Sequence, residues 1–543
     1  MTRPEPSTCP PSEVHVTLST PEGLRLRVPD GTNGCERAPS RTDTPDSVVS
    51  SISSTQRKAR SYTPGPIRVR FSALKDILVV LRLRYMSSLY YLSCVGFVIQ
   101  FGLWAYHKPE VVVHIPNETV ADACAQLWAE LRGLLPLFLV MVGSFLMRRD
   151  KSVYLLDFAL FEPPAEWCLT RENIMTILKN AGKIAGSFEE TELEFMRKVL
   201  VNSGTGDSTS WPPGITRCQQ DGVPQDQTMK AAREEADTVI CSCLESLFDR
   251  TGVQPKEVDF FIINCSLFSP TPSLCAMACN RFQMRSGVKT FNLSGMGCSA
   301  SLIAVDLAAE LLQNNPNSLA IVVSTELITQ SLYHGAEKSM LLQNTLFRCG
   351  GAAICLTNKP RLAGRARYRL RHLVRTQCTD DDSYGAVYQC EDPKGASGIR
   401  LSKEIVKIAG KCMTKNLTQL GPLVLPIFEQ VRVLGSIVRR KLKGSGSGAV
   451  YVPSFRSAVH YFCIHAGGRA VLDGIEKNLR LLPEDLEASR AVLHSQGNTS
   501  SSSIWYELRY IEEHKDLRRG HKILQLAFGS GFKCNSAVWT RMR

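Results

Sequence analysis

The sequence predicts an α/β protein with a mainly parallel sheet covered by helices, preceded by a membrane hairpin. Short apolar runs recur from residue 153 onward, as in 258–264 and 319–323, and helical patterns such as 226–247 lie between them. Strands that are apolar on both faces and alternate with helices are typical of parallel sheets buried on both sides. Two long apolar runs between residues 89 and 147 predict the hairpin.

The N-terminal quarter of the chain is predicted to hold a tail and a membrane anchor. Residues 1–66 are rich in Ser, Thr, Pro and Gly and show little aliphatic patterning, which predicts a disordered tail. Within the predicted anchor, 67–152, the run 89–106 carries no charge and has aromatic residues at both ends, as a transmembrane helix does. The run 131–147 is shorter, so a tilted span is favoured over a re-entrant arm.

The charges around the two runs predict their orientation. Basic residues flank the hairpin on its outer sides, whereas the loop between the runs is acidic, so both ends are expected in the cytosol. The glycosylation sequon at Asn117 would then be lumenal. Those at Asn292, Asn416 and Asn498 would stay unmodified.

The body from residue 153 onward supplies the remaining elements. Strands are expected at 258–264, 319–323, 352–356 and 523–528, and helices at 226–247, 298–312 and 469–481. The run 420–442 is apolar enough to suggest a third membrane span, but Glu429, Arg432 and two prolines interrupt it. A surface-bound or substrate-channel segment is therefore favoured. Residues 444–448 are predicted to form a flexible glycine-serine loop.

Charge and cysteine usage indicate the kind of partner and compartment. The formal net charge of +13 suits an anionic partner. Because many basic residues in 57–84 lie beside the first membrane run and no nucleic-acid motif is present, a lipid surface is favoured over nucleic acid. The 19 cysteines, without regular spacing or a secretory signal, are expected to be reduced thiols facing the cytosol.

Cys298 is the candidate nucleophile. In 291–300 an apolar run turns through two glycines and delivers Cys298 to the start of a helix, whose buried face is expected at Ala300, Ile303, Ala304, Leu307, Ala308 and Leu311. The unpaired N–H groups at a helix N-terminus favour a thiolate and can hold an oxyanion. The alternative is an ordinary buried thiol.

Two later stretches supply candidate partners for this cysteine. Residues 463–468 and 497–503 place His465 and Asn498 beside glycines, with a predicted helix between them. A cysteine, a neutral histidine and an asparagine suit acyl transfer, since the thiol carries the acyl group and the other two donate to a developing oxyanion.

Other interpretations of these residues stay open from the pattern alone. His465 can be a structural histidine and Asn498 a helix cap or turn. A metal site of His460, Cys463 and His465 is disfavoured because no second ligand pair follows at zinc-finger spacing. A cysteine protease of the papain type is also disfavoured, because the glycine-rich turn before Cys298 does not match that signature.

Seven stretches then carry a recognisable family pattern: 264–273, 292–300, 323–326, 420–426, 462–470, 497–508 and 528–535. They closely resemble the plant-type 3-ketoacyl-CoA synthases, the condensing enzymes of very-long-chain fatty acid elongation. The resemblance covers about 153–543. It implies a thiolase-like fold of two similar α/β halves, 153–360 with the nucleophile and 361–543 with the histidine and asparagine. It also implies an endoplasmic reticulum membrane location, with the catalytic body facing the cytosol.

The resemblance implies roles for the candidate residues. Cys298 matches the nucleophile, His465 the histidine and Asn498 the asparagine, and backbone N–H groups of Cys298 and of the turn at Gly529 and Ser530 are candidates for the oxyanion hole. The implied substrates are a long-chain acyl-CoA and malonyl-CoA, with no cofactor or metal. A homodimer, and reductase and dehydratase partners, are also implied. A type III polyketide-like synthase and a silent membrane scaffold of the same fold are the alternatives.

The sequence departs from this family pattern at four positions. Ser294 and Ser301 stand where glycine is usual, and Gln377 and Tyr461 stand where histidine is usual. Gln377 and Tyr461, together with the nearby His460 and His494, are therefore retained as accessory polar candidates.

Overall fold

The computed structural model describes residues 152–442 and 451–543. The predicted tail at 1–66, both membrane candidates and the glycine-serine loop at 444–448 lie outside these residues. Among the described helices, none is both long and apolar enough to cross a bilayer.

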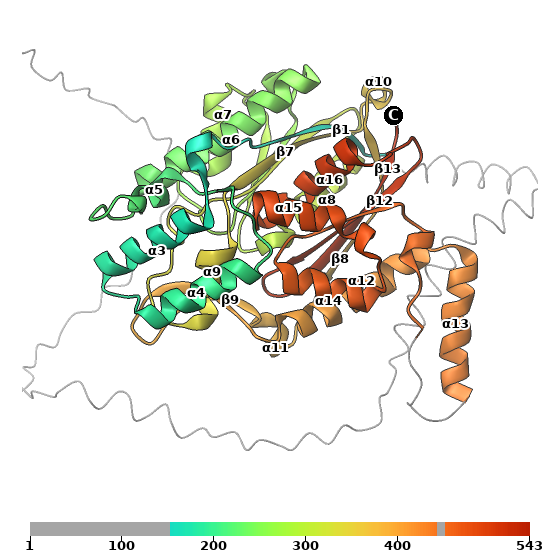
Figure 1. Cartoon of the computed structure of the whole chain (residues 1–543). Helices are drawn as coiled ribbons and strands as arrows, with labels where there is room; N and C mark the ends of the chain where they lie inside the picture. The colour runs from blue at the N-terminus through green and yellow to red at the C-terminus, as the bar shows by residue number, and fades with distance from the viewer. Residues whose placement is uncertain (1–151, 443–450) are drawn as a thin grey trace, which may run out of the picture. The chain divides into compact units, whose positions relative to one another are not determined.

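The body is built on one nine-stranded sheet with the order β11-β12-β13-β8-β1-β7-β6-β4-β5 (Figure 1). Its strands are β1 (Tyr154–Leu160), β4 (Phe260–Asn264), β5 (Lys289–Leu293), β6 (Leu319–Glu326), β7 (Gly350–Thr357), β8 (Tyr368–Gln377), β11 (Tyr461–Ile464), β12 (Lys522–Gly529) and β13 (Lys533–Arg541). Strands β4, β6, β7 and β12 confirm the four strands predicted from the sequence. Two small sheets pair β2 (Cys168–Leu169) with β3 (Thr209–Ser210) and β9 (Val387–Glu391) with β10 (Ser397–Leu401).

The sheet is mixed, so the prediction of a mainly parallel sheet was wrong. Strand β4 runs parallel to β5 and β6, and β11 runs parallel to β12. The other neighbouring pairs are antiparallel. A strand has apolar residues on both faces when helices cover both sides of the sheet. Such burial occurs in parallel and antiparallel sheets alike, so it does not indicate strand direction. The direction is decided by the connections, such as the tight turn that joins β12 to β13.

The strand order separates the sheet into two halves. Strands β5, β4, β6, β7 and β1 come from residues 154–357, and β8, β13, β12 and β11 come from 368–541. The halves meet where β1 pairs with β8 over two residue pairs, Tyr154 with Arg369 and Leu155 with Tyr368. Because this junction is short, packing between the halves has to supply most of what holds them together.

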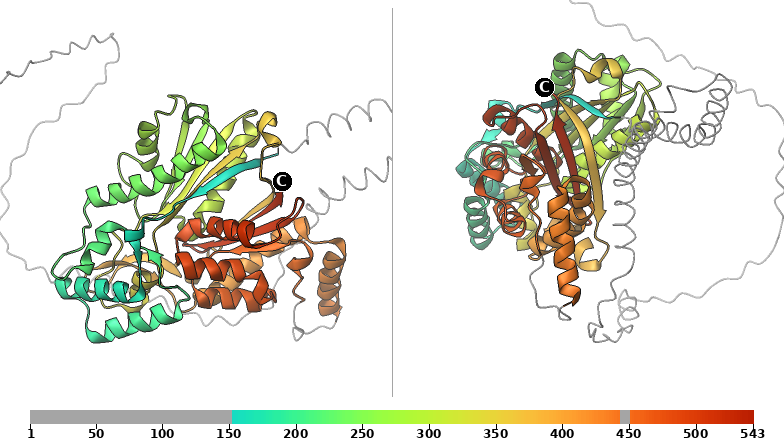
Figure 2. Two further views of the ribbon diagram at one scale, coloured as in Figure 1. Left: turned by 45° about the horizontal axis from the view of Figure 1, so that its top comes forward. Right: turned by 90° about the vertical axis from the view of Figure 1, so that its right-hand side faces the viewer.

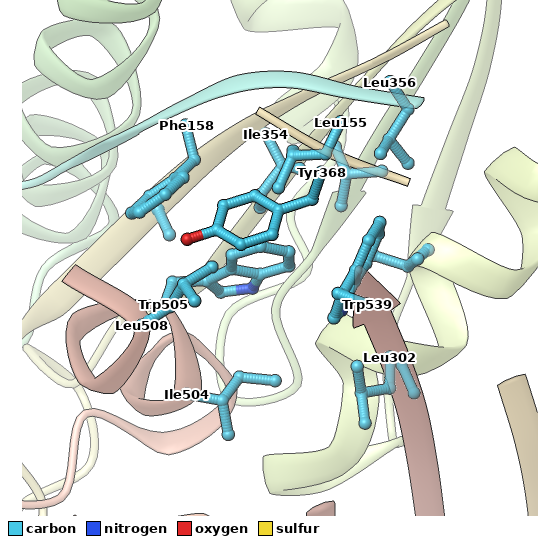
Figure 3. Packing of buried hydrophobic residues seen from close by; sticks show 14 of the residues in the cluster. Leu155, Phe158, Leu302, Ile354, Leu356, Tyr368, Ile504, Trp505, Leu508 and Trp539 are labelled. Atoms are coloured by element: carbon cyan, nitrogen blue, oxygen red, sulfur yellow. The ribbon is translucent and has the colours of Figure 1, made fainter. Parts of the chain in front are cut away.

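Two helices supply that packing. The helix α8 (Ala300–Asn314) and the helix α16 (Ser503–His514) lie within the core cluster that both halves share. Figure 3 shows Trp505 of α16 between Phe158 of β1 and Trp539 of β13, and Leu302 of α8 below Trp539. The buried face predicted for α8 is largely correct. The helix is in addition buried on its other sides, at Ser301, Leu302, Val305, Ala309 and Leu312, because the second half covers it.

The remaining helices surround the nine-stranded sheet (Figure 2). They are α3 (Arg171–Ala185), α4 (Glu190–Asn202), α5 (Pro213–Thr216), α6 (Met229–Thr251), α7 (Leu274–Arg281), α9 (Lys338–Leu346), α10 (Pro360–Ala363), α11 (Asp381–Tyr384), α12 (Ile405–Val424), α13 (Ile427–Leu442), α14 (Arg469–Leu479) and α15 (Glu487–Gln496). The helices α6 and α14 confirm the predicted helices at 226–247 and 469–481. The apolar run 420–442 forms the end of α12 followed by α13.

Candidate active site

Cys298 lies in a tight turn between β5 and α8. The turn is a short 3-10 segment, Gly297–Ser299, directly before the first residue of α8. Gly297 has a φ of +63°, which glycine adopts without strain. A Cβ atom at this position would lie 2.6 Å from the backbone nitrogen of Ser530. The glycine therefore lets the turn that carries Cys298 pack directly against the β12–β13 turn.

His465 follows the end of β11, and a hydrogen bond to one of its ring nitrogens orients its side chain. Its Nδ1 lies 2.8 Å from Oγ of Ser503, the first residue of α16. When the Ser503 hydroxyl donates to Nδ1, the neutral ring carries its proton on Nε2 and can donate it to a ligand. A Cβ at Gly467 would lie 3.2 Å from Nε2, so glycine there keeps space around this nitrogen.

The side chain of Asn498 is oriented by the backbone around it. Its Oδ1 accepts a hydrogen bond from the N–H of Ser500 at 2.9 Å, and its Nδ2 lies 3.4 Å from the carbonyl oxygen of Gly467. The oxygen of the amide is thereby committed as an acceptor. The Nδ2 group is left as the hydrogen-bond donor of this side chain.

One cavity of about 980 Å³ joins the three candidate residues. Cys298, His465 and Asn498 all line it, and so do Gly529 and Ser530. Much of the remaining wall is apolar and comes from several elements: Phe195, Val199, Leu342, Leu346, Phe347, Val387, Ile399, Leu401, Ile405, Val406, Ala409 and Val471. Three cationic residues, Lys198, Arg469 and Lys533, also line the cavity. The site can therefore take an extended apolar chain together with an anionic group.

Burial keeps the cysteine and the histidine neutral. It raises the pKa of the Cys298 thiol to about 11, to which the Glu326 carboxylate also contributes, whereas the hydroxyl of Ser500 acts in the opposite direction. Burial lowers the pKa of His465 to about 4. The expectation that the helix N-terminus holds Cys298 as a thiolate was therefore wrong, because removal from water outweighs the N–H groups of the turn.

Comparisons with known proteins identify the family. A model described as "FAE1/Type III polyketide synthase-like protein" matches residues 145–442, and one described as "Chalcone and stilbene synthases, C-terminal domain" matches 454–541. The curated 3-ketoacyl-CoA synthase 17 of Arabidopsis thaliana is 48% identical over 408 residues, which cover 75% of this chain and 82% of the relative. The chain belongs to the 3-ketoacyl-CoA synthase family. For 3-ketoacyl-CoA synthase 6 of the same organism, the identity is 47% over 437 residues, with 79% and 84% covered.

Solved structures support the thiolase-like fold of this family member. A polyketide synthase from the brown alga Ectocarpus siliculosus aligns with a TM-score of 0.55 and 16% identity, over 72% of this chain and 98% of that one. A type III pentaketide synthase from Neurospora crassa aligns with a TM-score of 0.53 and 16% identity, over 72% and 99%. The fold predicted for the body is thus confirmed at this level.

Of the four accessory candidates in this chain, only Gln377 lies at the cavity. Gln377, at the end of β8, lines the cavity. His460 stacks on His521 with ring centroids 4.3 Å apart, and Tyr461 donates its hydroxyl to the carbonyl of Asp516 at 2.9 Å, both away from the cavity. His494 lies in α15 and is also absent from the cavity lining.

Two further residues of the family member reach the site. The buried carboxylate of Glu326, at the end of β6, accepts the backbone N–H groups of Ser266 and Leu267, both at 2.7 Å, and the hydroxyl of Ser500 at 3.1 Å. The Ser500 hydroxyl also lowers the pKa of the Cys298 thiol. The sequence contained a weak signal for both, since each lies within a stretch that resembles the family, but no spacing indicated that they meet.

No group of three or more potential metal ligands was found among the residues that the structure describes. Cys463 lies on β11 and is buried in the core, whereas His460 directly precedes this strand and His465 directly follows it.

Proposed function

We propose that this chain is a 3-ketoacyl-CoA synthase that condenses malonyl-CoA with a long-chain acyl-CoA, the first step of very-long-chain fatty acid elongation. The carrying observation is one largely apolar cavity that Cys298, His465 and Asn498 all line. The curated relatives are named as enzymes of this activity and favour it over polyketide synthesis or a silent scaffold.

The first half-reaction loads the enzyme. The sulfur of Cys298 attacks the acyl-CoA thioester, an acyl-cysteine thioester forms, and coenzyme A leaves with the proton of the thiol. Because the resting thiol is neutral, the proton has to leave as the C–S bond forms. His465 can carry it when its neutral ring has the proton on Nδ1, donated to the Ser503 hydroxyl, because Nε2 is then free to accept the thiol proton and pass it to the leaving sulfur.

The second half-reaction makes the new carbon–carbon bond. Malonyl-CoA loses carbon dioxide, and the charge of the resulting enolate is stabilised on the thioester oxygen by Nε2–H of His465 and Nδ2–H of Asn498. The carbanion attacks the acyl-cysteine, and the C–S bond breaks. A 3-ketoacyl-CoA two carbons longer is released, and the thiolate of Cys298 regains a proton.

Backbone N–H groups are proposed to hold the oxyanion of the acyl group. The Gly529–Ser530 turn packs on the turn of Cys298 so closely that a Cβ at Gly529 would lie 2.5 Å from the carbonyl oxygen of Met296. The N–H groups of Cys298 and of this turn are therefore the candidates.

The cellular setting of this proposal follows from the family. We expect no cofactor, an endoplasmic reticulum membrane location with the body in the cytosol, and a homodimer. Reductase and dehydratase partners are expected because a 3-keto product needs further steps before another round.

The test is a condensation assay with the full chain in membranes. Labelled malonyl-CoA and saturated acyl-CoAs of increasing length should give products with one malonyl unit added. Cys298→Ala should give no product, whereas Cys279→Ala, a matched change at a half-buried thiol on α7, should retain it. Several malonyl additions followed by cyclisation would point to a polyketide synthase, and product from Cys298→Ala would refute the mechanism.

A further inference from the structure

The helix α13 presents its apolar side chains outward. Ile427, Phe428, Val431 and Leu434, together with Ile437 and Val438, are between 42% and 62% exposed. The positions 427, 431, 434 and 438 follow the spacing of one helix face. In Figures 1 and 2 the helix stands at the edge of the body, separate from the sheet. An apolar helix face of this length that is exposed to solvent indicates an interaction site.

The polar side of α13 is fixed to the body. Glu429 is almost fully buried and accepts hydrogen bonds from the hydroxyl of Tyr451 at 2.7 Å and from the N–H of Ser454 at 3.1 Å. The backbone N–H of Tyr451 is donated to Oγ of Ser436 at 3.4 Å. These contacts prevent the helix from rotating its apolar face inward without leaving a buried carboxylate unpaired.

Basic residues accompany the apolar face. Arg432 is exposed and lies over the ring of Phe428, with its guanidinium carbon 5.5 Å from the ring centre. Arg439 is also exposed, and the chain continues with Arg440, Lys441 and Lys443. Glu429 is the one acidic residue of the helix, and it points inward. The outward surface of α13 is therefore apolar and cationic.

We propose that α13 lies in the interface of an anionic lipid bilayer, with its apolar face among the acyl chains and its arginines at the headgroups. A helix of 16 residues is about 24 Å long, which suits a helix lying in the plane of the interface. The charge favours lipid over a second copy of the chain, because two α13 surfaces that met would both carry Arg432 and Arg439 and neither would offer an exposed acidic residue to pair with them. The contact is separate from the predicted hairpin and from the condensation reaction.

The test is site-specific photocrosslinking of the full chain in lipid vesicles. The photoreactive amino acid p-benzoylphenylalanine is introduced at Val431, Leu434 or Val438, and at Thr418 on the exposed side of α12 as the matched control. Vesicles of phosphatidylcholine with phosphatidylserine should give lipid adducts at the three α13 positions and background at Thr418. Arg439→Gln should lower the yield about fivefold on these vesicles, since that is the contribution of one basic residue at an anionic surface.

Three outcomes would overturn the proposal. Adducts to a second copy of the chain would make α13 a dimer contact, and adducts within the chain would make it a docking site for another segment. Absence of adducts at all three positions would show that the apolar face of α13 is exposed to solvent. Condensation activity measured on the same vesicles separates these outcomes from failure of the proposed function, because the assay does not depend on where α13 lies.

Discussion

Ser301 stands where the family resemblance led us to expect glycine, and the structure shows which contact the serine makes. Its Oγ accepts a hydrogen bond of 2.6 Å from Nε1 of Trp505, and both residues are completely buried. Ser301 lies in the first full turn of α8 and Trp505 lies in α16, so the bond joins the two helices that the halves share. The Ser301→Ala change would leave the indole N–H without a partner.

The expected cost of Ser301→Ala is about 1–3 kcal/mol of unfolding free energy, the penalty for a buried unpaired donor. Activity should stay within about one order of magnitude, because the change does not touch the reacting atoms. A tenfold loss of rate would require the activation barrier to rise by about 1.4 kcal/mol. Ser301→Gly should be less stable than Ser301→Ala, since glycine adds up to about 1 kcal/mol within a helix.

A double-mutant cycle measures the bond itself. Ser301→Ala, Trp505→Phe and the double variant are compared by thermal unfolding in detergent, with condensation activity measured beside it. A coupling energy of about 1 kcal/mol between the two positions is expected. Additive effects would show that the hydrogen bond contributes nothing. A large gain of activity in Ser301→Gly would show that the turn beside the nucleophile is impaired in the natural protein.

Three further predictions follow from the site. Alkylation of Cys298 by iodoacetamide should rise about tenfold per pH unit from pH 7 to 10, because its pKa is about 11; a plateau below pH 9 would contradict this. Gly529→Ala should reduce condensation at least about tenfold, because its Cβ would displace the Met296 carbonyl; unchanged turnover would exclude close packing here. Since His465 has a lowered pKa, the unfolded state binds its proton first. Stability should therefore fall from pH 6.5 to about 4, and His465→Gln should weaken this dependence in acid denaturation.

The candidate site was largely predictable because its residues lie in local patterns. A glycine turn before a helix marked Cys298, and glycines beside polar residues marked His465 and Asn498. Their convergence on one cavity follows from the way the strand ends of both halves approach each other. The regular strands and helices were predictable for the same reason, since each is encoded by its own apolar spacing.

Properties that depend on distant residues could not be predicted. The pKa of Cys298 depends first on its burial by the surrounding elements, and then on Ser500 and Glu326, which lie on other elements. Strand direction depends on connections rather than on apolar content, so a mixed sheet was taken for a parallel one. His460 and Tyr461 were retained as candidates because of their nearness in sequence to His465. They lie at the start of the strand β11, whereas His465 follows its other end. Neither His460 nor Tyr461 lines the cavity.

The burial of Cys298 has a consequence for the protein while it is being made. Cys298 leaves the ribosome long before His465 and Asn498, and until the second half folds its thiol has the pKa of an exposed cysteine, about 8.5. In the folded protein the pKa is about 11. Completion of the fold thus lowers the ionised fraction of this thiol at neutral pH. The unfinished chain is therefore the form in which this thiol is most open to oxidation or alkylation.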